Sequence, residues 1–222
     1  MASLPFGMIL KWSDGTRVKE VQAMKVARAA GLPVPRKKLG QVYEGLDEDE
    51  REAIFQELKL YLDTMRKWPN PWGGDRICSL TGSAIRSVRV RNHKVGPCEN
   101  EQEFNDYLIS AAFSRMFSSE KAYRHARNRA QKLHSMPHRV VFSHGNLKHH
   151  NVMVHKGRIS GFLDWESAGW YPEYWEYTTS LRFTRETFWW FNFVARLGGE
   201  KYLVELQCAR ALTLLTSSSY VW

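Results

Sequence analysis

Apolar positions along the chain follow two different spacings, and each spacing predicts its own kind of element. Short apolar or β-branched runs closed by turn residues predict strands at 8–12, 139–143, 151–154 and 159–163, with Lys156-Gly157 as a hairpin turn. Apolar residues three or four positions apart predict helices over 17–30, 47–67, 101–117, 120–133, 174–197 and 201–216. The pattern predicts a mixture of short strands and longer helices.

One long stretch lacks either spacing. Residues 68–97 carry four glycines and three prolines without sustained periodicity, which predicts an ordered loop. Loops of this length often line binding sites. Trp68 and Trp72 at its start are therefore candidate ligand contacts.

The composition is that of a globular protein of one domain or two closely packed lobes. The 222 residues are 43% hydrophobic and 25% charged, and no apolar run approaches the roughly 20 residues that cross a bilayer. The N-terminal residues lack the basic and apolar regions of a signal peptide, and three scattered cysteines offer no disulfide framework. We expect a reduced, cytoplasmic protein without a membrane partner.

The net charge of +9 favours anionic partners. The basic residues are spread along the chain, however, and their two clusters, at 86–94 and 121–132, do not interleave aromatic residues as single-strand binders do. We interpret both clusters as solvated faces and expect no nucleic-acid partner.

The segment 143–166 carries the most specific motif. It begins Ser-His-Gly-Asn-Leu-Lys-His-His-Asn-Val-Met-Val and, after a hairpin turn, continues Ile-Ser-Gly-Phe-Leu-Asp-Trp-Glu. This segment resembles the aminoglycoside phosphotransferase/choline kinase-like family, and the continuation through 167–177 resembles its fungal branch. The resemblance covers most of residues 8–215. It implies an α+β, protein kinase-like fold with a mainly helical C-terminal lobe.

The resemblance also implies roles for individual residues. The family's motif His-Gly-Asp-Leu-x-x-x-Asn supplies a catalytic base and a magnesium ligand, and a later Asp supplies a second ligand. Here Asn151 and Asp164 stand at the two metal positions, with Glu166 as a further candidate ligand. Asn146 stands at the position of the base, and a carboxamide cannot take up a proton at ordinary pH. Losing a positioned base costs about 10²–10⁴ in rate.

The N-terminal part resembles the family more weakly. Lys11 and Glu20 look like the pair that holds ATP phosphates. Only ten residues precede Lys11, too few for the two strands and loop that roof the nucleotide, and eleven residues replace the strand pair and hinge before Asp47. We therefore expect residues 1–38 to be a truncated N-terminal lobe and residues 39–222 to be the helical lobe, with 143–166 as its catalytic-loop-like segment.

Three classes of function remain open. The losses at the base, roof and hinge favour a diverged member that does not transfer phosphate. Such a protein would need no cofactor and would bind a small, largely apolar metabolite, acting on it as an ATP-independent cyclase or isomerase of secondary metabolism. Its catalytic residues would be Asp164, His144 and Asn146. The alternatives are an active kinase that uses ATP and magnesium, and a non-catalytic pseudokinase scaffold.

Each candidate residue also has a purely structural interpretation. Lys11 and Glu20 could form an ordinary exposed ion pair, and Asn151 and Asp164 could only brace the loop. Trp165 is a candidate substrate contact together with Trp68 and Trp72, but the aromatic run that it begins is typical of core packing. The histidines near the motif lack partners that would complete a zinc site. A shortened lobe with an uncovered strand edge favours a homodimer, unless loop 68–97 covers it in a monomer.

Overall fold

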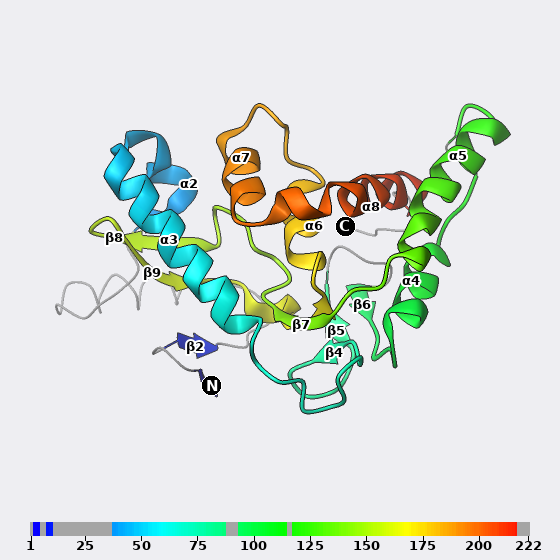
Figure 1. Cartoon of the computed structure of the whole chain (residues 1–222), viewed down its shortest axis with the longest axis horizontal. Helices are drawn as coiled ribbons and strands as arrows, with labels where there is room; N and C mark the ends of the chain where they lie inside the picture. Colours follow the sequence, from blue (N-terminus) through cyan, green and yellow to red (C-terminus); the bar gives the residue numbers. More distant parts are fainter. Residues whose placement is uncertain (1, 5–7, 11–36, 88–92, 115–116, 217–222) are drawn as a thin grey trace, which may run out of the picture. The chain divides into compact units, whose positions relative to one another are not determined.

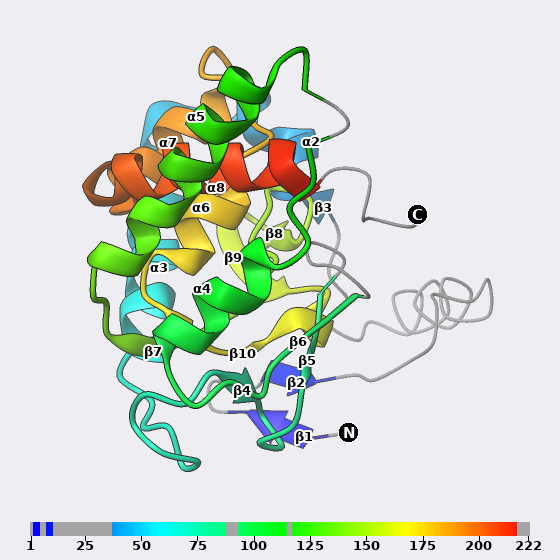
Figure 2. The same ribbon diagram turned by 90° about the vertical axis from the view of Figure 1, so that its right-hand side faces the viewer.

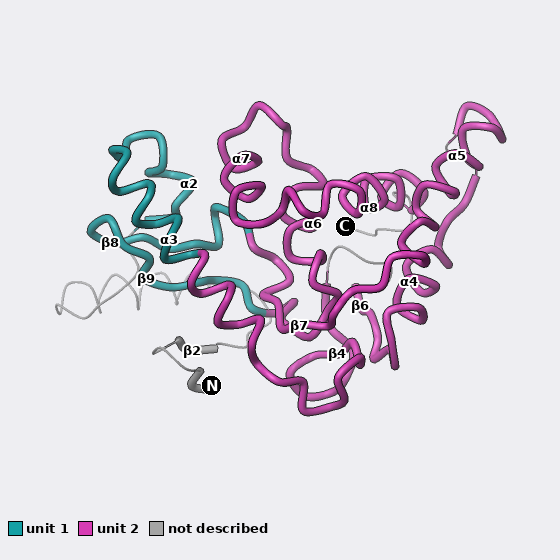
Figure 3. Tube along the Cα trace, viewed as in Figure 1, with its two compact units in different colours: residues 1–58, 148–165 teal, residues 59–147, 166–222 magenta. Residues whose placement is uncertain are grey.

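The computed structural model describes residues 2–4, 8–10, 37–87, 93–114 and 117–216. The chain divides into two compact units, coloured separately in Figure 3. Unit 1 contains residues 1–58 and 148–165, and unit 2 contains residues 59–147 and 166–222. The segment 143–166 therefore contributes to both units. The lobe boundary at residue 38 stays a prediction.

The N-terminal strand of unit 1 is confirmed, with a partner that the pattern did not predict. β2 (Met8–Leu10) pairs antiparallel with β1 (Ala2–Leu4), so two short strands lie where the sequence pattern predicted one. The predicted helix 17–30, together with Lys11 and Glu20, lies outside the described residues. The homodimer stays a prediction.

The second sheet of unit 1 contains the predicted hairpin. Its order is β3 (Lys37–Lys38), β8 (Val152–His155) and β9 (Arg158–Phe162), all antiparallel. Lys156 and Gly157 form the two-residue turn, and both have positive φ, as the favoured type of tight hairpin turn requires. Sequence pattern and turn residues therefore agree with the fold at this point.

Helices accompany this sheet in sequence. α2 (Leu39–Val42) and the 3₁₀ turn η2 (Tyr43–Gly45) lead into α3 (Glu48–Met65), which begins in unit 1 and ends in unit 2. Asp47 and Glu50 cap α3 reciprocally, since each backbone N–H donates to the other's carboxylate, at 3.3 and 2.8 Å. The helix predicted over 47–67 is thereby confirmed.

Unit 2 contains two further antiparallel sheets. One has the order β4 (Cys78–Ser79), β10 (Gly169–Pro172) and β7 (Val140–Ser143), and the other pairs β5 (Ile85–Arg86) with β6 (Lys94–Val95). The stretch 68–97 thus contains three short strands in addition to loop. β10 is buried at all four residues. It was not predicted because Gly-Trp-Tyr-Pro has no alternation of apolar and polar residues.

The helices of unit 2 are shorter than predicted at two places. They are α4 (Glu101–Ile109), α5 (Glu120–Gln131) with the 3₁₀ turn η4 (Lys132–Ser135), α6 (Trp175–Leu181), α7 (Trp189–Arg196), and α8 (Leu203–Thr216) preceded by η6 (Gly199–Tyr202). The Ser110 hydroxyl donates to the Tyr107 carbonyl where α4 ends. The predicted helix 174–197 is two helices, α6 and α7, because residues 182–188 between them are not helical.

The main core of unit 2 is aromatic at its centre. α5 packs along α8, as Figures 1 and 2 show, and α4 also contacts α8. Phe104 of α4 is fully buried and packs edge-on against Trp175 and Tyr171, which stack on each other with ring centroids 5.3 Å apart. Most of the tryptophans between 165 and 190 are therefore core residues, as expected for an aromatic run.

Two sequence-level expectations concern the whole chain. In the described ranges, no helix has the length and apolarity needed to span a bilayer. Cys78, Cys98 and Cys208 are free and buried. Burial, followed by the charges of Glu103 and Glu99, raises the pKa of Cys98 to about 11, so this thiol stays protonated at neutral pH.

The aromatic core gives a prediction for stability. Phe104→Ala removes a fully buried ring that packs edge-on against two other aromatic rings, so we expect the free energy of unfolding to decrease by about 3–5 kcal/mol. Leu60→Ala is the control, because Leu60 is 64% exposed, and it should change stability by less than about 0.5 kcal/mol. Urea denaturation measures both. Equal effects of the two variants would contradict this assignment of the core.

Candidate functional site

A single buried carboxylate, that of Glu176, binds the backbone of the loop that follows β7, residues 144–147. Glu176, in the first turn of α6, is 1% exposed. Its Oε2 accepts the backbone N–H of His144 at 2.5 Å and that of Gly145 at 3.2 Å, and its Oε1 accepts that of Leu147 at 3.2 Å. The hydroxyl of Ser180, one turn later in α6, donates to the Leu147 carbonyl. Four backbone groups of residues 144–147 are thus fixed by one helix.

Gly145 is required by this arrangement. Its φ is +76°, and a Cβ at this position would lie 2.2 Å from the carbonyl oxygen of Ser167. Both the left-handed backbone and the close approach exclude any other residue without rearrangement. The loop therefore turns against the chain around Ser167, within unit 2.

His144 and Asn146 meet within this loop. His144 is fully buried, and its Nδ1 accepts the backbone N–H of Asn146 at 3.3 Å. An accepting Nδ1 carries no proton, so the neutral ring has its hydrogen on Nε2. The buried His144 ring therefore stabilises the conformation of the loop through its contact with the Asn146 backbone. The Asn146 side chain is half-buried and follows directly after the Glu176-bound residues.

The two predicted metal ligands are brought together by the hairpin of unit 1. Val152 of β8 lies opposite Phe162 of β9, and the Leu163 N–H donates to the Asn151 carbonyl at 2.8 Å. Asn151 is 6% exposed, and its own N–H donates to Lys148 at 2.8 Å. Asp164 follows one residue later, exposed. The Asn151 carboxamide and the Asp164 carboxylate therefore extend from backbone segments that are hydrogen-bonded to each other at Asn151 and Leu163.

Asp164 has a backbone conformation that is uncommon for a side-chain-bearing residue. Its φ is +65°, in the left-handed region where Asp and Asn are the usual non-glycine residues. Residues held in this region cluster at functional sites. Oxygen ligands of this kind suit magnesium, which is typically bound by one or two protein groups together with water and phosphate. The donor set of Asn151 and Asp164 thus fits that ion.

Glu166 has a different surrounding. It belongs to the 3₁₀ turn η5 (Trp165–Ser167), and its Oε2 lies 3.6 Å from Nε of Arg86, which is also exposed. A surface ion pair of this length contributes about 0–1 kcal/mol. The guanidinium partly neutralises the carboxylate. Glu166 is accordingly the weakest of the three predicted magnesium ligands.

The histidines of the loop in unit 1 are held in place by packing. The Gly40 N–H donates to the His149 carbonyl at 3.1 Å, and a Cβ on Gly40 would lie 2.1 Å from His149 Nδ1. Burial, then the positive charges of His150 and Lys148, lowers the pKa of His149, so its ring is neutral at pH 7. Across the described ranges, no three His, Cys, Asp or Glu side chains are placed to hold a metal ion together.

The three tryptophans predicted to contact a ligand each have a protein partner. The Trp165 indole N–H donates to the Phe162 carbonyl at 3.1 Å, and the residue is 7% exposed in unit 1. In unit 2, Trp68 stacks on Phe142 with centroids 4.9 Å apart, and the Trp72 indole N–H donates to the Leu80 carbonyl at 3.3 Å although Trp72 is 44% exposed. Of the three, Trp72 has the most surface available to a ligand. Their binding roles stay predictions.

Sequence reasoning missed the role of Glu176. Glu176 lies near the end of an aromatic run, Trp-Tyr-Pro-Glu-Tyr-Trp-Glu-Tyr, at 170–177. Between 174 and 181, all residues except Glu176 are apolar or carry a hydroxyl group. A lone acid in a buried run needs several hydrogen-bond donors. That signal could have identified a buried carboxylate, although the sequence does not indicate which backbone it binds.

Glu176→Gln tests the loop clamp. The glutamine keeps one acceptor oxygen but turns an NH₂ group toward backbone donors, so we expect the free energy of unfolding to decrease by about 2–4 kcal/mol. Glu186→Gln is the matched control, because Glu186 is 66% exposed and pairs only with Arg210 among the contacts described, and it should cost less than about 1 kcal/mol. Chemical denaturation gives both values. A harmless Glu176→Gln would contradict the clamp.

Comparison with known proteins agrees with the motif. The model of the phosphotransferase enzyme family matches residues 10–211, which include every candidate residue described above. Comparison with curated protein sequences found no significant match. The family implies a kinase-like fold, and the chain has the corresponding mixture of helices and small antiparallel sheets. Because the match covers well over half of its length, this chain belongs to the phosphotransferase enzyme family.

Proposed function

We propose that this chain is a phosphotransferase-family protein that does not transfer phosphate effectively and instead binds a small, largely apolar metabolite. The observation that carries the proposal is Asn146 at the position where the family has its base. Phosphoryl transfer needs a group that positions the attacking hydroxyl and accepts its proton. The backbone of residues 144–147 is well held by Glu176 and Ser180, so within this loop the deficit lies in the side chain of Asn146.

Asp164 is the residue best suited to another role. It is an exposed carboxylate on a restrained backbone, next to Leu163, whose side chain is 37% exposed. An acid beside apolar surface suits proton transfer on an apolar molecule, as in an ATP-independent cyclase or isomerase. We assign the proton to Asp164 rather than to His144, because His144 is fully buried.

The second candidate is an active kinase that uses ATP and magnesium. The pairing of Asn151 with the Leu163–Asp164 backbone favours it, because these two side chains would hold the ion. Magnesium would supply neutralisation of phosphate charge. A non-catalytic scaffold is the third candidate, supported by the hydrogen bonds to Glu176 of α6 that fix the loop backbone for a purely structural purpose.

Nucleotide affinity separates the first candidate from the second. We expect Mg-ATP to bind more weakly than about 1 mM or not at all, because the chain between Pro35 and Asp47 is short for the strand pair and hinge that hold a nucleotide in the family. Isothermal titration calorimetry measures this, with Asp164→Ala as the control for specific binding. Submillimolar affinity that requires magnesium and disappears in Asp164→Ala would overturn the proposal in favour of the kinase.

Restoring the missing carboxylate tests the role of position 146. We expect Asn146→Asp to show no phosphoryl transfer or ATP hydrolysis above background, because a base alone does not restore nucleotide binding. Asn146→Ala is the matched control for a changed side chain without a base. A gain of about 10²–10⁴ over the parent in Asn146→Asp alone would show a kinase disabled only at its base.

A further inference from the structure

A buried histidine outside the loop is bound on both sides by carboxylates. His138 lies just before β7, and its side chain is 7% exposed. Its Nδ1 is 2.8 Å from Oε1 of Glu101, and its Nε2 is 3.0 Å from Oε1 of Glu205. The two carboxylates are themselves only 13% and 10% exposed. Glu101 begins α4 and Glu205 lies in the first turn of α8, so the three groups join separate parts of unit 2.

For both contacts to be hydrogen bonds, the cluster must hold one proton more than a neutral imidazole and two ionised carboxylates contain. A neutral imidazole has one N–H and one lone pair, so it can donate to only one of two ionised carboxylates. The second contact would then place a lone pair against a carboxylate oxygen. Both contacts become hydrogen bonds if the ring is doubly protonated, or if one carboxylic acid donates to a neutral ring. In either arrangement the cluster binds one proton.

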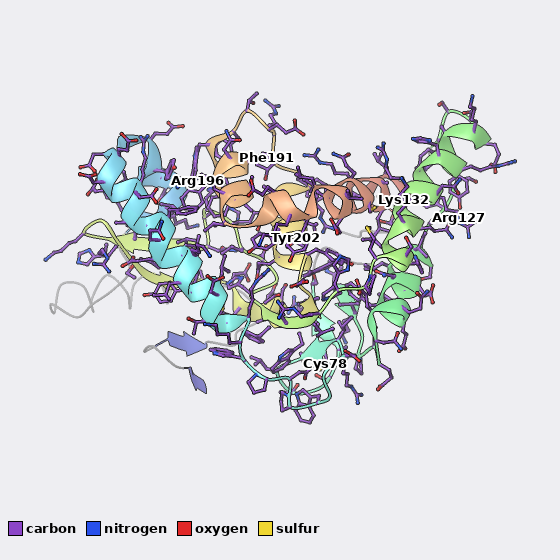
Figure 4. All side chains as sticks on the ribbon, viewed as in Figure 1. Cys78, Arg127, Lys132, Phe191, Arg196 and Tyr202 are labelled. Carbon is purple, nitrogen blue, oxygen red and sulfur yellow. The ribbon has the colours of Figure 1, made fainter. Side chains whose placement is uncertain are left out.

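Other hydrogen bonds fix the cluster in this geometry. Glu101 Oε2 also accepts the backbone N–H of His138 at 2.8 Å, so Glu101 contacts that residue twice. The ring of His138 packs edge-on against Tyr174 at 4.7 Å, and Tyr202, labelled in Figure 4, lies 6.4 Å away. Oε2 of Glu205 is buried without a hydrogen-bond partner. The contact of Oε1 with His138 is therefore the hydrogen bond that compensates the burial of the Glu205 carboxylate.

Near neutral pH, no neighbouring titratable group among the described residues supplies a charge that would substitute for the shared proton. Burial raises the pKa of Tyr174 well above its ordinary value, and it also raises those of Tyr202 and Cys208, so all three are neutral. Arg139 is 80% exposed and pairs with Glu173 at 3.0 Å. The positive charges of Lys132 in η4 and Arg129 in α5 lower the pKa of Cys208, but the effect of burial is larger. The charge balance at the cluster is thus set by Glu101, His138 and Glu205.

We propose that Glu101, His138 and Glu205 form a proton-dependent clasp that holds α4 and α8 to the chain entering β7. Losing the shared proton leaves one carboxylate facing a lone pair in a buried position. The clasp therefore weakens unit 2 in mildly alkaline solution. It is independent of the function proposed for the loop.

The direction of the pH dependence follows from the protonation of His138. Burial alone lowers the pKa of this histidine, but hydrogen bonds to Glu101 and Glu205, and then their charges, raise it, and the net change is upward. An unfolded histidine has a pKa of about 6.5. The stabilisation is therefore fully present below about pH 6.5 and is lost as the pH rises through the higher pKa of the folded protein.

Urea denaturation of the full chain at several values between pH 6 and 8 tests the clasp. The folding equilibrium constant should decrease by up to about tenfold per pH unit above pH 6.5, the limit for one proton. Glu205→Gln should remove that decrease, because a glutamine amide can donate to the Nε2 lone pair of a neutral ring. His134→Gln is the control, since His134 makes a comparable contact with Asp106, which is 62% exposed. It should retain the parental decrease.

A titration of the unmodified protein keeps the test independent of how the variants fold. Nuclear magnetic resonance of the His138 ring should give a midpoint above about 6.5. A midpoint at or below that value would overturn the proposal. So would an equal pH dependence of stability in the parent and Glu205→Gln.

Discussion

The carboxylate of Glu176 determines the shape of the loop on which the family motif lies. Burying an ionised carboxylate costs several kcal/mol unless hydrogen bonds compensate it, and here three backbone N–H groups do so. The helix that carries Glu176 is buried at every residue and follows directly from the aromatic core around Trp175. The order of dependence therefore runs from core packing to α6, and from α6 to the loop.

A similar arrangement holds the other half of the motif in unit 1. Glu57 of α3 binds the side chain of Arg158, and it accepts the Ile159 N–H at 2.7 Å, so the helix holds β9 at its start. At its far end the same hairpin joins Leu163 to Asn151. In both units a helical glutamate anchors backbone that leads to candidate residues. The motif itself thus has structural support at each of its two parts.

The sequence predicted elements wherever local pattern and turn chemistry agree. The hairpin at Lys156-Gly157 and the helix capped by Asp47 are of this kind, since their signals lie within a few residues. β10 was missed because burial on both faces removes alternation, and the break after Leu181 was missed because residues 182–188 contain no glycine or proline to mark it. Family membership and the pairing of Asn151 with the residues before Asp164 were predictable from motif spacing.

The missed contacts share a different property. Glu176 binds residues about thirty positions away, and His138 binds Glu101 and Glu205 from 37 and 67 positions away. Nothing in the local sequence of either residue indicates the partner, because the contact exists only once the helices are packed. Sequence reasoning could identify that such polar residues needed hydrogen-bond partners. The identity of those partners follows only from the fold.

The tight fit at Gly145 has a consequence for how such a chain can evolve. A side chain at 145 collides with the Ser167 carbonyl, so folding alone selects glycine there whether or not the protein is an enzyme. Position 146 is only half-buried and experiences no such collision. Genetic drift can therefore change the chemistry of position 146 while the glycine beside it persists. A recognisable His-Gly pair in a related sequence records selection for a foldable loop, and it is a poor guide to whether catalysis has been retained.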